Sequence, residues 1–398
     1  MSCFARVLLA PSDPIFGLVS QYQRDPRSSK VDLTAGIYKN ELLKTPIMQA
    51  VKKIEHYLLA QEDNKEYLPI QGDGGYLSAV ANMVFGSDLS RNLSDCMSSF
   101  QTIGGTGALR IGGELIKQEL GDKIYISDPS WPNHQGVFSR VGLVVTCYPY
   151  YNWVTHRFDF VAMEQFLNGL PPKSVVLLHA GCHNPSGQDP SFEQWQMMAN
   201  LFRERDLIPF FDGAYLGFAG TPDEDAYPIR LFAKMGIDMF VAISFSKNFS
   251  LYGERTGALF VLSRDKDLEK NVASQLKTIV RRNYSNPPMH GMKIVKGILQ
   301  DPILTKEWLS ELAAMRQRIA SVKQEFILKL SSSLISKDYK YLQEASGMFC
   351  FCSLGTKEVE RLREEYAIYM TTDSRINLAG LISSNIDYVV NSIVKVVG

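Results

Sequence analysis

The apolar positions of the chain form short continuous runs that alternate with segments of helical spacing. Six runs are short enough to be buried strands, and they cover residues 123–127, 143–147, 175–179, 207–212, 239–244 and 258–262. Between the third and the fourth run, residues 192–205 have the spacing of a helix. Buried strands that alternate with helices are typical of a mainly parallel sheet covered on both faces. The pattern therefore predicts an α/β fold.

Turn formers and helical spacing fill the chain before this region. Residues 10–44 are rich in turn-forming residues, which predicts an arm and a loop lying over another part of the structure or over a neighbouring subunit. A helix with one buried stripe is predicted by apolar residues at intervals of four, three and four, namely Ile47, Val51, Ile54 and Leu58. A loop follows, and a second helical run extends through Phe85.

A glycine-rich segment, residues 104–107, opens a further predicted helix. The apolar residues of this helix are Leu109, Leu115, Ile116 and Leu120. Free N–H groups and the positive end of the helix dipole make such a start suited to an anion. Because ligands of parallel sheets gather at the carboxyl ends of the strands, we expect this helix start to meet Asp212 and Lys247 there.

Beyond residue 288 the pattern becomes mainly helical. Seven apolar residues between Trp308 and Leu330 recur at intervals of three and four, which predicts a long helix that could bridge two lobes. The chain closes with a shorter α+β segment, predicted as a strand at 347–351, a helix at 358–369, a strand at 375–378 and a final helix to Val397.

The amino-acid composition limits the kinds of molecule that the protein is expected to bind. The chain has 42 basic and 42 acidic residues, so no bulk positive field favours nucleic acid or an anionic membrane. No apolar run approaches the ~18 residues of a membrane span, and the N-terminus lacks the apolar length of a signal peptide. Six scattered cysteines with no C-x-x-C pair predict reduced thiols and a cytoplasmic protein. The expected partner is a small molecule.

The most informative polar residue is Lys247. A lysine after a strand is usually a surface residue, but Ser244, Ser246 and Arg255 nearby are suited to hold a phosphate. A lysine that is partly removed from water can lose its proton near neutral pH. An enzyme would hold a phosphorylated aldehyde cofactor in this way. The alternative for Arg255 is a helix cap or an ion pair with Glu254.

Asp212 ends a predicted strand, and Tyr215 follows three residues later. A carboxylate at the end of a buried strand needs a partner, and a protonated pyridine nitrogen would serve. Holding that proton would make the ring an electron sink. The alternative is that Asp212 caps the start of a helix.

His179, Cys182 and His183 invite a metal interpretation. Their spacing matches no familiar zinc pattern, and no other Cys or His cluster completes a set, so we expect no metal. Histidines in such a segment are more often core residues bonded to the backbone. In the turn that follows, Asn184 can point its amide into a site.

Four further residues leave their roles open. Trp131 is either a core residue or a flat face for an aromatic cofactor. Three arginines are candidate carboxylate clamps or else surface charges: Arg281, Arg282 and Arg375.

Taken together, these motifs resemble the class I aspartate aminotransferase family, which belongs to fold type I of the pyridoxal-phosphate enzymes. The resemblance runs essentially end to end and rests on motifs at residues 10–15, 36–39, 67–70, 104–110, 130–134, 183–187, 212–215, 246–249, 283–288 and 374–377. Each motif is weak alone, but their common order is specific.

The resemblance implies a role for each candidate in binding pyridoxal 5'-phosphate. Lys247 would form the covalent link to the cofactor and move the proton from the substrate α-carbon. Asp212 would bond the pyridine nitrogen with His134 behind it, Tyr215 and Asn184 would contact the phenolic oxygen, and Trp131 would stack on the ring. The phosphate would be held by Gly105, Thr106, Ser244, Ser246, Arg255 and, from the other subunit, Tyr67.

The resemblance also implies how the substrate is bound. Arg375 would bind the α-carboxylate, helped by Asn184, Trp131 and the Gly36 backbone. Arg281, acting from the other subunit, would bind the distal carboxylate of a dicarboxylic substrate. Active sites shared in this way imply a homodimer, with the N-terminal arm clasping the partner.

The implied architecture is a fold type I transferase of two domains. Residues 1–44 would form an N-terminal arm and part of a small domain. Residues 45–300 would form the large cofactor-binding domain, built on a mainly parallel mixed sheet. Residues 301–398 would form the smaller α+β domain, with the long bridging helix at its start.

The implied activity is reversible ping-pong transamination between L-aspartate, or another L-amino acid, and 2-oxoglutarate. An aromatic-amino-acid or dual-specificity aminotransferase is the alternative, because in related tyrosine aminotransferases the arginine equivalent to Arg281 swings aside for aromatic substrates. The sequence departs from the family pattern at Gly213, at residues 34–35 and at residues 371–373, and the first and last of these are expected near the substrate. A β-lyase or decarboxylase would keep Lys247 and Asp212 but need no distal clamp. A regulator would need an appended DNA-binding domain, for which an arm that begins by residue 10 leaves no room.

Overall fold

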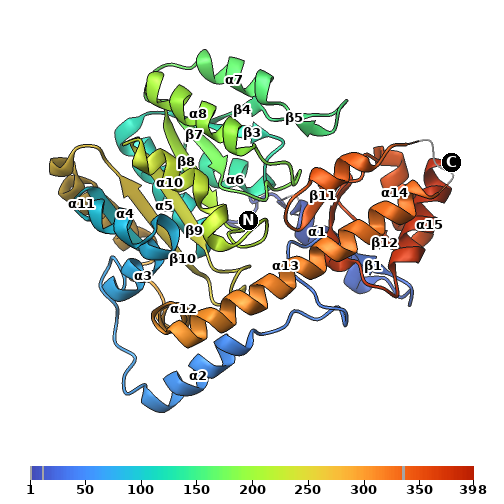
Figure 1. The fold of residues 1–398 in the computed structure, drawn as a ribbon, viewed down its shortest axis with the longest axis horizontal. Coiled ribbons are helices and arrows are strands. Elements are labelled where there is room, and N and C mark those ends of the chain that lie inside the picture. The colour runs from blue at the N-terminus through green and yellow to red at the C-terminus, as the bar shows by residue number, and fades with distance from the viewer. Residues whose placement is uncertain (1, 11–12, 334–336) are drawn as a thin grey trace.

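A seven-stranded sheet forms the centre of the protein. The computed structural model describes residues 2–10, 13–333 and 337–398. In the order of the sheet (Figure 1), the strands are β2 (Met97–Ile103), β10 (Thr256–Leu262), β9 (Met239–Ser244), β8 (Ile208–Gly213), β7 (Val175–His179), β3 (Lys123–Asp128) and β4 (Val144–Pro149). Neighbours from β9 to β4 are parallel, and β10 is antiparallel to both β9 and β2. The predicted mainly parallel sheet is confirmed.

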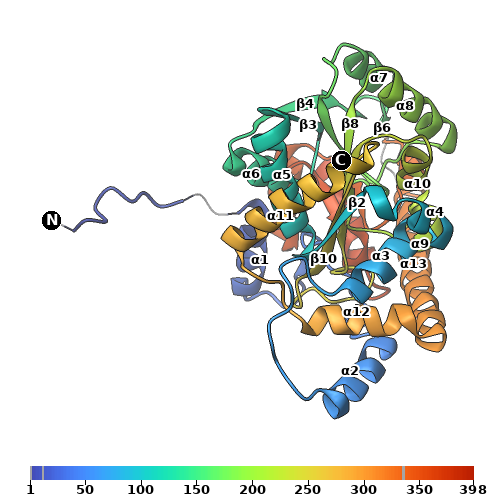
Figure 2. The same cartoon turned by 90° about the vertical axis from the view of Figure 1, so that its left-hand side faces the viewer.

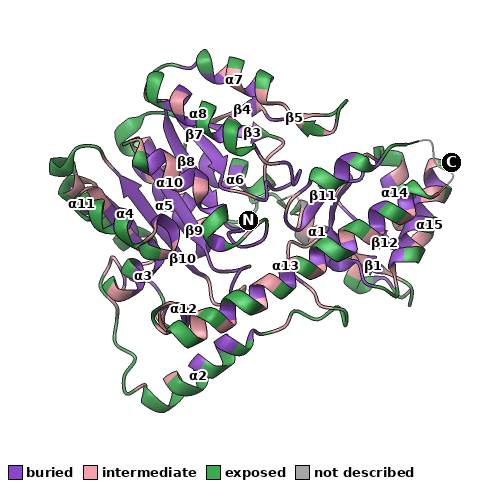
Figure 3. Cartoon of the chain, viewed as in Figure 1, coloured by how far each residue is buried: buried purple, intermediate pink, exposed green. Residues whose placement is uncertain are grey.

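Helices cover both faces of this sheet. Successive residues of a strand point to opposite faces, and in β8 Phe210 packs in one core cluster and Phe211 in the other. One face carries α5 (Gly104–Leu115), α6 (Pro132–Val141) and α11 (Glu269–Asn283). The other carries α3 (Gly74–Phe85), α8 (Phe192–Glu204), α10 (Tyr227–Lys234) and α12 (His290–Gln300). Strands β7, β8, β9 and β10 are buried along their whole length (Figure 3), which explains their continuous apolar runs. We call the sheet and the elements packed around it the main unit.

Shorter elements complete the main unit. They are α4 (Ser87–Asn92), the hairpin of β5 (Tyr151–Asn152) and β6 (Arg157–Phe158), α7 (Phe160–Asn168) and α9 (Pro222–Asp225). In Figure 1 the hairpin projects from the main unit toward the C-terminal part of the chain.

A second group of elements, the C-terminal unit, lies beside the main unit. It consists of β1 (Val31–Asp32), η4 (Lys340–Glu344), β11 (Phe349–Phe351), α14 (Thr356–Tyr366), β12 (Ile368–Tyr369), β13 (Arg375–Asn377) and α15 (Ile386–Val397). Strand β1 pairs in parallel with β12, and β11 pairs antiparallel with β13. The 30-residue helix α13 (Pro302–Ser331) packs on α2 (Gln49–Gln61) and α12 and also on η4 and α15. The predicted long helix is therefore confirmed.

The N-terminal segment leaves the body of the protein. Residues 2–10 extend outward (Figure 2), with Leu8 and Leu9 88% and 99% exposed. Helix α1 (Pro14–Arg24) follows, so the predicted turn-rich arm contains a helix. Pro11 and Ser12, which belong to the predicted arm, lie outside the described residues. None of the helices described here has the length and apolar character to cross a membrane.

Two residues predicted to be buried on helices are exposed. Ile47 lies before the start of α2 and is 53% exposed, because Met48 has the extended backbone of the residue that precedes a helix. Leu120 is 44% exposed, because the helix changes to a π-helical turn over Ile116–Leu120. That turn rotates later side chains away from the buried stripe.

The predicted boundaries near the C-terminus also need correction. Helix α14 ends at Tyr366 rather than at residue 369, because Ala367 takes a left-handed conformation with φ of 53° and β12 then pairs with β1. Strand β11 begins at Phe349 rather than 347, after Gly347 with φ of 70°. Strand β13 ends at Asn377, whose side chain caps the turn that follows.

Candidate active site

A cavity of about 650 Å³ opens at the carboxyl ends of the strands, between the main unit and the C-terminal unit. Its volume lies in the range of ~300–1,000 Å³ typical of small-molecule sites. Twelve predicted site residues line it together: Gly36, Gly105, Thr106, Trp131, Asn184, Asp212, Tyr215, Ser244, Ser246, Lys247, Arg255 and Arg375. Another hollow, of about 670 Å³ beside β2 and α3, is lined by none of the predicted site residues. We place the site in the first cavity because the buried ionisable groups converge there.

Lys247 projects into this cavity from the turn that follows β9. Its Nζ lies 4.7 Å from the centre of the Tyr215 ring. Burial lowers the pKa of Lys247 to about 8, and the charge of Arg255 acts in the same direction, whereas Asp212 opposes the shift. A substantial fraction of the amine is therefore neutral near physiological pH, as a nucleophile or a base requires.

Asp212 faces the cavity from the end of β8. Its Oδ2 lies 2.9 Å from His134 Nε2, and His134 Nδ1 lies 2.9 Å from the Ser130 hydroxyl. With Ser130 donating to Nδ1, His134 donates from Nε2 to the carboxylate. Burial alone would raise the pKa of Asp212, but the hydrogen bond from His134 and the nearby charge of Lys247 bring it below its usual value. Asp212 is thus an ionised hydrogen-bond acceptor.

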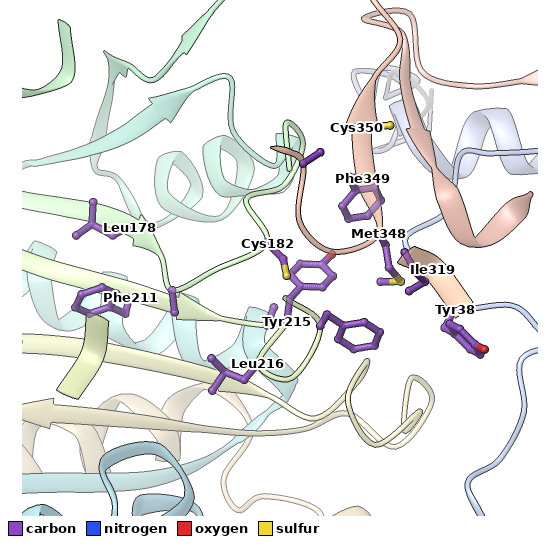
Figure 4. Packing of buried hydrophobic residues seen from close by; sticks show 14 of the residues in the cluster. Tyr38, Leu178, Cys182, Phe211, Tyr215, Leu216, Ile319, Met348, Phe349 and Cys350 are labelled. Atoms are coloured by element: carbon purple, nitrogen blue, oxygen red, sulfur yellow. The ribbon is translucent and has the colours of Figure 1, made fainter. Parts of the chain in front are cut away.

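Tyr215, Asn184 and Arg375 form a chain of contacts across the cavity. Asn184 Nδ2 donates to the Tyr215 hydroxyl at 3.4 Å, and Arg375 Nη1 donates to Asn184 Oδ1 at 3.2 Å. The Arg375 Nη2 atom donates to the Thr34 carbonyl at 2.6 Å, while its buried Nε has no hydrogen-bond partner. Phe349 lies beside Tyr215 (Figure 4), with its ring 4.7 Å from the Arg375 guanidinium. The guanidinium is thus fixed by protein contacts and keeps a donor for a ligand.

Ser244, Ser246 and Arg255 form a polar cradle at the start of α5. Arg255 Nη1 donates to the Ser246 hydroxyl at 3.2 Å, and the Ser244 hydroxyl donates to Ser246 Oγ at 3.1 Å. A Cβ atom at Gly104 would lie 2.7 Å from Arg255 Nη2, and one at Gly105 would lie 3.0 Å from the Ser244 side chain. Because these positions are glycines, the backbone N–H groups at the start of α5 lie close to Arg255. The N–H groups and the guanidinium can then bind the same phosphate.

These groups together fit pyridoxal phosphate. The cavity presents a lysine for an aldehyde, an ionised carboxylate for a protonated ring nitrogen, and a helix start with an arginine for a phosphate. A separate guanidinium, that of Arg375, is available for a substrate carboxylate.

Three predicted site residues do not line the cavity of their own chain: His134, which lies behind Asp212, Tyr67 and Arg281. Tyr67 is 92% exposed, and Arg281 is exposed on α11, where it hydrogen-bonds to Ser285. Arg282, the third candidate clamp, is exposed as well. The structure therefore brings most of the predicted cofactor-binding residues together in one cavity. Arg281, which was predicted to bind the distal carboxylate of the substrate, lies apart from them in the same chain.

Sequence reasoning missed several residues of the cavity wall, including Phe349, Tyr252 and the apolar side chains Ile15, Ile37 and Leu109. No local pattern marks them, since each is an ordinary apolar or aromatic residue of a helix, strand or loop. His179 also lines the cavity, and its Nε2 has no hydrogen-bond partner. Burial lowers the pKa of His179 to about 3, so its ring is neutral.

His183 is a core residue rather than part of the cavity. Its ring nitrogens contact the hydroxyls of Ser127 at 2.9 Å and Ser186 at 2.7 Å, and its ring stacks on Tyr150. Its side-chain partners are thus hydroxyls, not the backbone groups that we predicted. Among the described residues, no three His, Cys, Asp or Glu side chains come together as a set of metal ligands.

Comparisons with known proteins agree with this geometry. The signature of the family described as aminotransferase class I and II matches residues 28–393. The chain is 41% identical to the aspartate aminotransferase of Escherichia coli (strain K12), covering 99% of this chain and 100% of that protein. It is 40% identical to the aromatic-amino-acid aminotransferase of the same organism, with the same coverage. A structure of an aromatic-amino-acid aminotransferase from Burkholderia pseudomallei, covalently bound to pyridoxal phosphate, matches with a TM-score of 0.96 and 41% identity over 100% of both chains.

Proposed function

The chain belongs to aminotransferase class I and II and is a pyridoxal-phosphate-dependent enzyme of fold type I, and we propose that it transfers the amino group of L-aspartate to 2-oxoglutarate. The observation that carries this proposal is the convergence of Lys247, Asp212 and Arg375 on one cavity. When bound, pyridoxal phosphate supplies an aldehyde that accepts the amino group and a ring that withdraws electrons from the substrate α-carbon.

The residues of this chain would divide the chemistry as follows. Lys247 would form the covalent link to the cofactor and, with its pKa near 8, would act as the base that moves the α-carbon proton. Asp212, held by His134, would keep the ring nitrogen protonated. Arg375 would fix the substrate α-carboxylate and so orient the α-carbon toward Lys247.

We assign cofactor contacts to the other cavity residues. The phosphate would lie among Ser244, Ser246, Arg255 and the helix start at Gly105 and Thr106. Tyr215 and Asn184 would contact the phenolic oxygen, and Trp131 would cover the ring. These assignments are supported by the fact that all of these residues line the same cavity.

A homodimer is part of this proposal. Arg281 and Tyr67 are exposed and outside the cavity of their own chain, so they can serve the site of a partner subunit. The extended residues 2–10, with Leu8 and Leu9 exposed, provide an apolar arm for the same contact. In this arrangement the partner subunit's Arg281 would bind the distal carboxylate of the substrate.

The division into domains and the location in the cell are also proposals. We propose an arm at residues 1–44, a large domain at 45–300 and a small domain at 301–398. The pairing of β1 with β12 supports a contribution of the arm segment to the small domain. We propose a cytoplasmic location because all six cysteines are free.

An aromatic amino acid is the second candidate substrate. Ile15, Ile37 and Leu109 give the cavity apolar walls, and aromatic-amino-acid aminotransferases are as similar to this chain as aspartate aminotransferases are.

The ratio of kcat/KM for aspartate and phenylalanine, each with 2-oxoglutarate, separates the two substrates. We expect aspartate to be preferred, and we expect Arg281→Ala to raise KM for aspartate far more than for phenylalanine, because only aspartate has a distal carboxylate. A large preference for phenylalanine in the unmodified enzyme would contradict the assignment of aspartate.

A further inference from the structure

The hairpin of β5 and β6 projects from the main unit (Figure 1). Tyr151 pairs with Phe158 and Asn152 with Arg157. The turn between the strands is fixed by Asn152, whose Oδ1 accepts hydrogen bonds from the backbone N–H groups of residues 154 and 155 at 2.9 and 3.1 Å. This turn is therefore defined by its own hydrogen bonds.

The base of the hairpin rests on the loop that carries Asn184. Tyr150 stacks on His183 with ring centres 3.9 Å apart, and the Tyr150 hydroxyl donates to the Gln188 carbonyl at 2.7 Å. Because His183 directly precedes Asn184, the base of the hairpin holds one side of the Asn184–Arg375 contact.

The tip of the hairpin contacts the C-terminal unit. The rings of Tyr151 and Trp153 lie 5.2 and 5.0 Å from the Phe351 ring. His156 packs on Tyr341 at 4.6 Å, and its Nδ1 lies 3.1 Å from the Ser353 hydroxyl.

An ion pair adds to the contact at the tip of the hairpin. Arg157 Nη2 lies 2.6 Å from Glu344 Oε1. Both side chains are about half exposed, so solvent screens this ion pair and the aromatic contacts dominate.

Phe351, which the tip of the hairpin contacts, lies next to the proposed carboxylate clamp, Arg375. In the antiparallel β11–β13 pair, Phe351 lies directly opposite Arg375. Phe349, two residues earlier and thus on the same face of β11, packs on the Arg375 guanidinium. The hairpin therefore spans from the Asn184 loop at its base to the strand pair that holds Arg375 at its tip.

We propose that residues 150–158 form a brace that fixes the distance between Asn184 and Arg375, and that Trp153 is a positioning residue for the substrate α-carboxylate. This proposal rests on the assignment of Arg375 as the α-carboxylate clamp. Trp153 does not line the cavity, and it acts through Phe351. Its half-exposed indole, 51% accessible, is held against strand β11 of the C-terminal unit rather than inside a core.

The brace makes a specific kinetic prediction. Every amino-acid and oxo-acid substrate carries an α-carboxylate, so Trp153→Ala should raise KM for aspartate, phenylalanine and 2-oxoglutarate alike, by about fivefold, as expected for the loss of one aromatic contact. The kcat should change less than about twofold, because the lost interaction is the same in ground and transition states. Trp153→Phe should restore most of the affinity.

The test uses the holoenzyme and two controls. Val154→Ala, at the same turn with a side chain that is 89% exposed, should leave KM unchanged. Arg157→Glu should raise KM slightly, and Arg157→Glu combined with Glu344→Arg should reverse the effect. Amide hydrogen exchange of residues 349–353 should be faster in Trp153→Ala with no substrate present, which is a readout independent of catalysis.

The outcomes separate this proposal from the proposed function. If the unmodified enzyme transaminates but Trp153→Ala has normal KM values and normal exchange in residues 349–353, the brace is wrong. It is also wrong if the variant loses kcat or cofactor affinity instead. An unmodified enzyme that does not transaminate contradicts the proposed function, while faster exchange would still support the brace.

Discussion

At the scale of single residues, the chemistry depends on the protonation of Lys247. Burial and the charge of Arg255 lower its pKa from 10.5 to about 8. The neutral amine is the reactive form, and it predominates above the pKa of the group. Reactivity should therefore rise with pH up to about 8 and level off above it.

The uptake of pyridoxal phosphate by the cofactor-free enzyme measures this property. We expect the rate of covalent binding, followed by its absorbance, to increase about tenfold per pH unit below pH 7 and to be nearly constant above pH 9. Lys247→Ala is the matched control and should show neither covalent uptake nor transamination. A rate that still increased tenfold per unit at pH 9.5 would indicate an ordinary lysine and contradict the assignment.

Sequence reasoning was most successful at this scale. Lys247, Asp212 and Arg255 each follow or flank an apolar strand, so the topology of a parallel sheet brings them together, and the structure confirms their common cavity. Tyr252 and Phe349 could not be predicted as cavity residues. Packing between segments distant in sequence places them in the cavity wall, and the local sequence around each residue does not indicate this packing. Tyr67 and Arg281 were predicted as site residues, and their role stays a prediction.

At the scale of elements, the loop that carries Asn184 depends on Asp189. The carboxylate accepts hydrogen bonds from the backbone N–H groups of Cys182 at 2.7 Å and His183 at 2.9 Å, and Ser346 of the C-terminal unit also donates to it. Burial raises the pKa of Asp189, and the three hydrogen bonds, which favour the charged carboxylate, offset this rise only in part.

Removal of this carboxylate should destabilise the loop and the contact between the two units. Asp189→Ala leaves two buried N–H groups without acceptors, and we expect a loss of about 3 kcal/mol in the free energy of unfolding. Asp189→Asn keeps one acceptor oxygen and should lose less. Urea denaturation of the holoenzyme measures both, and a loss below about 0.5 kcal/mol for the alanine variant would show that the loop does not depend on Asp189.

The elements themselves were predictable where their signal is local. The six apolar strands and the long helix α13 have clear periodicity, and the structure contains each within two residues at the ends of the strands. Strand β2 was missed because its sequence, Met97–Ile103, is largely polar, and it is a strand only because it pairs with β10. Residues 368–369 were wrongly assigned to a helix for a similar reason. They form a strand because they pair with β1, which lies far away in the sequence.

At the scale of the whole molecule, the proposed role of Arg281 needs two subunits for each active site. Arg281→Ala and Lys247→Ala should each give a homodimer with little activity toward aspartate. A hybrid dimer of the two variants contains one site with an intact Lys247 and the partner subunit's Arg281, and we expect about half of the activity of the unmodified dimer. If Arg281 served its own chain, the hybrid would recover none.

In the proposed mechanism, the enzyme stores the amino group between two half-reactions. The most direct test mixes holoenzyme with L-aspartate in the absence of any oxo acid and follows the cofactor absorbance and the products. We expect about one equivalent of oxaloacetate per site, loss of the original absorbance band, and its return on addition of 2-oxoglutarate. Continued release of pyruvate or carbon dioxide without an amino acceptor would contradict this mechanism and indicate a lyase or a decarboxylase.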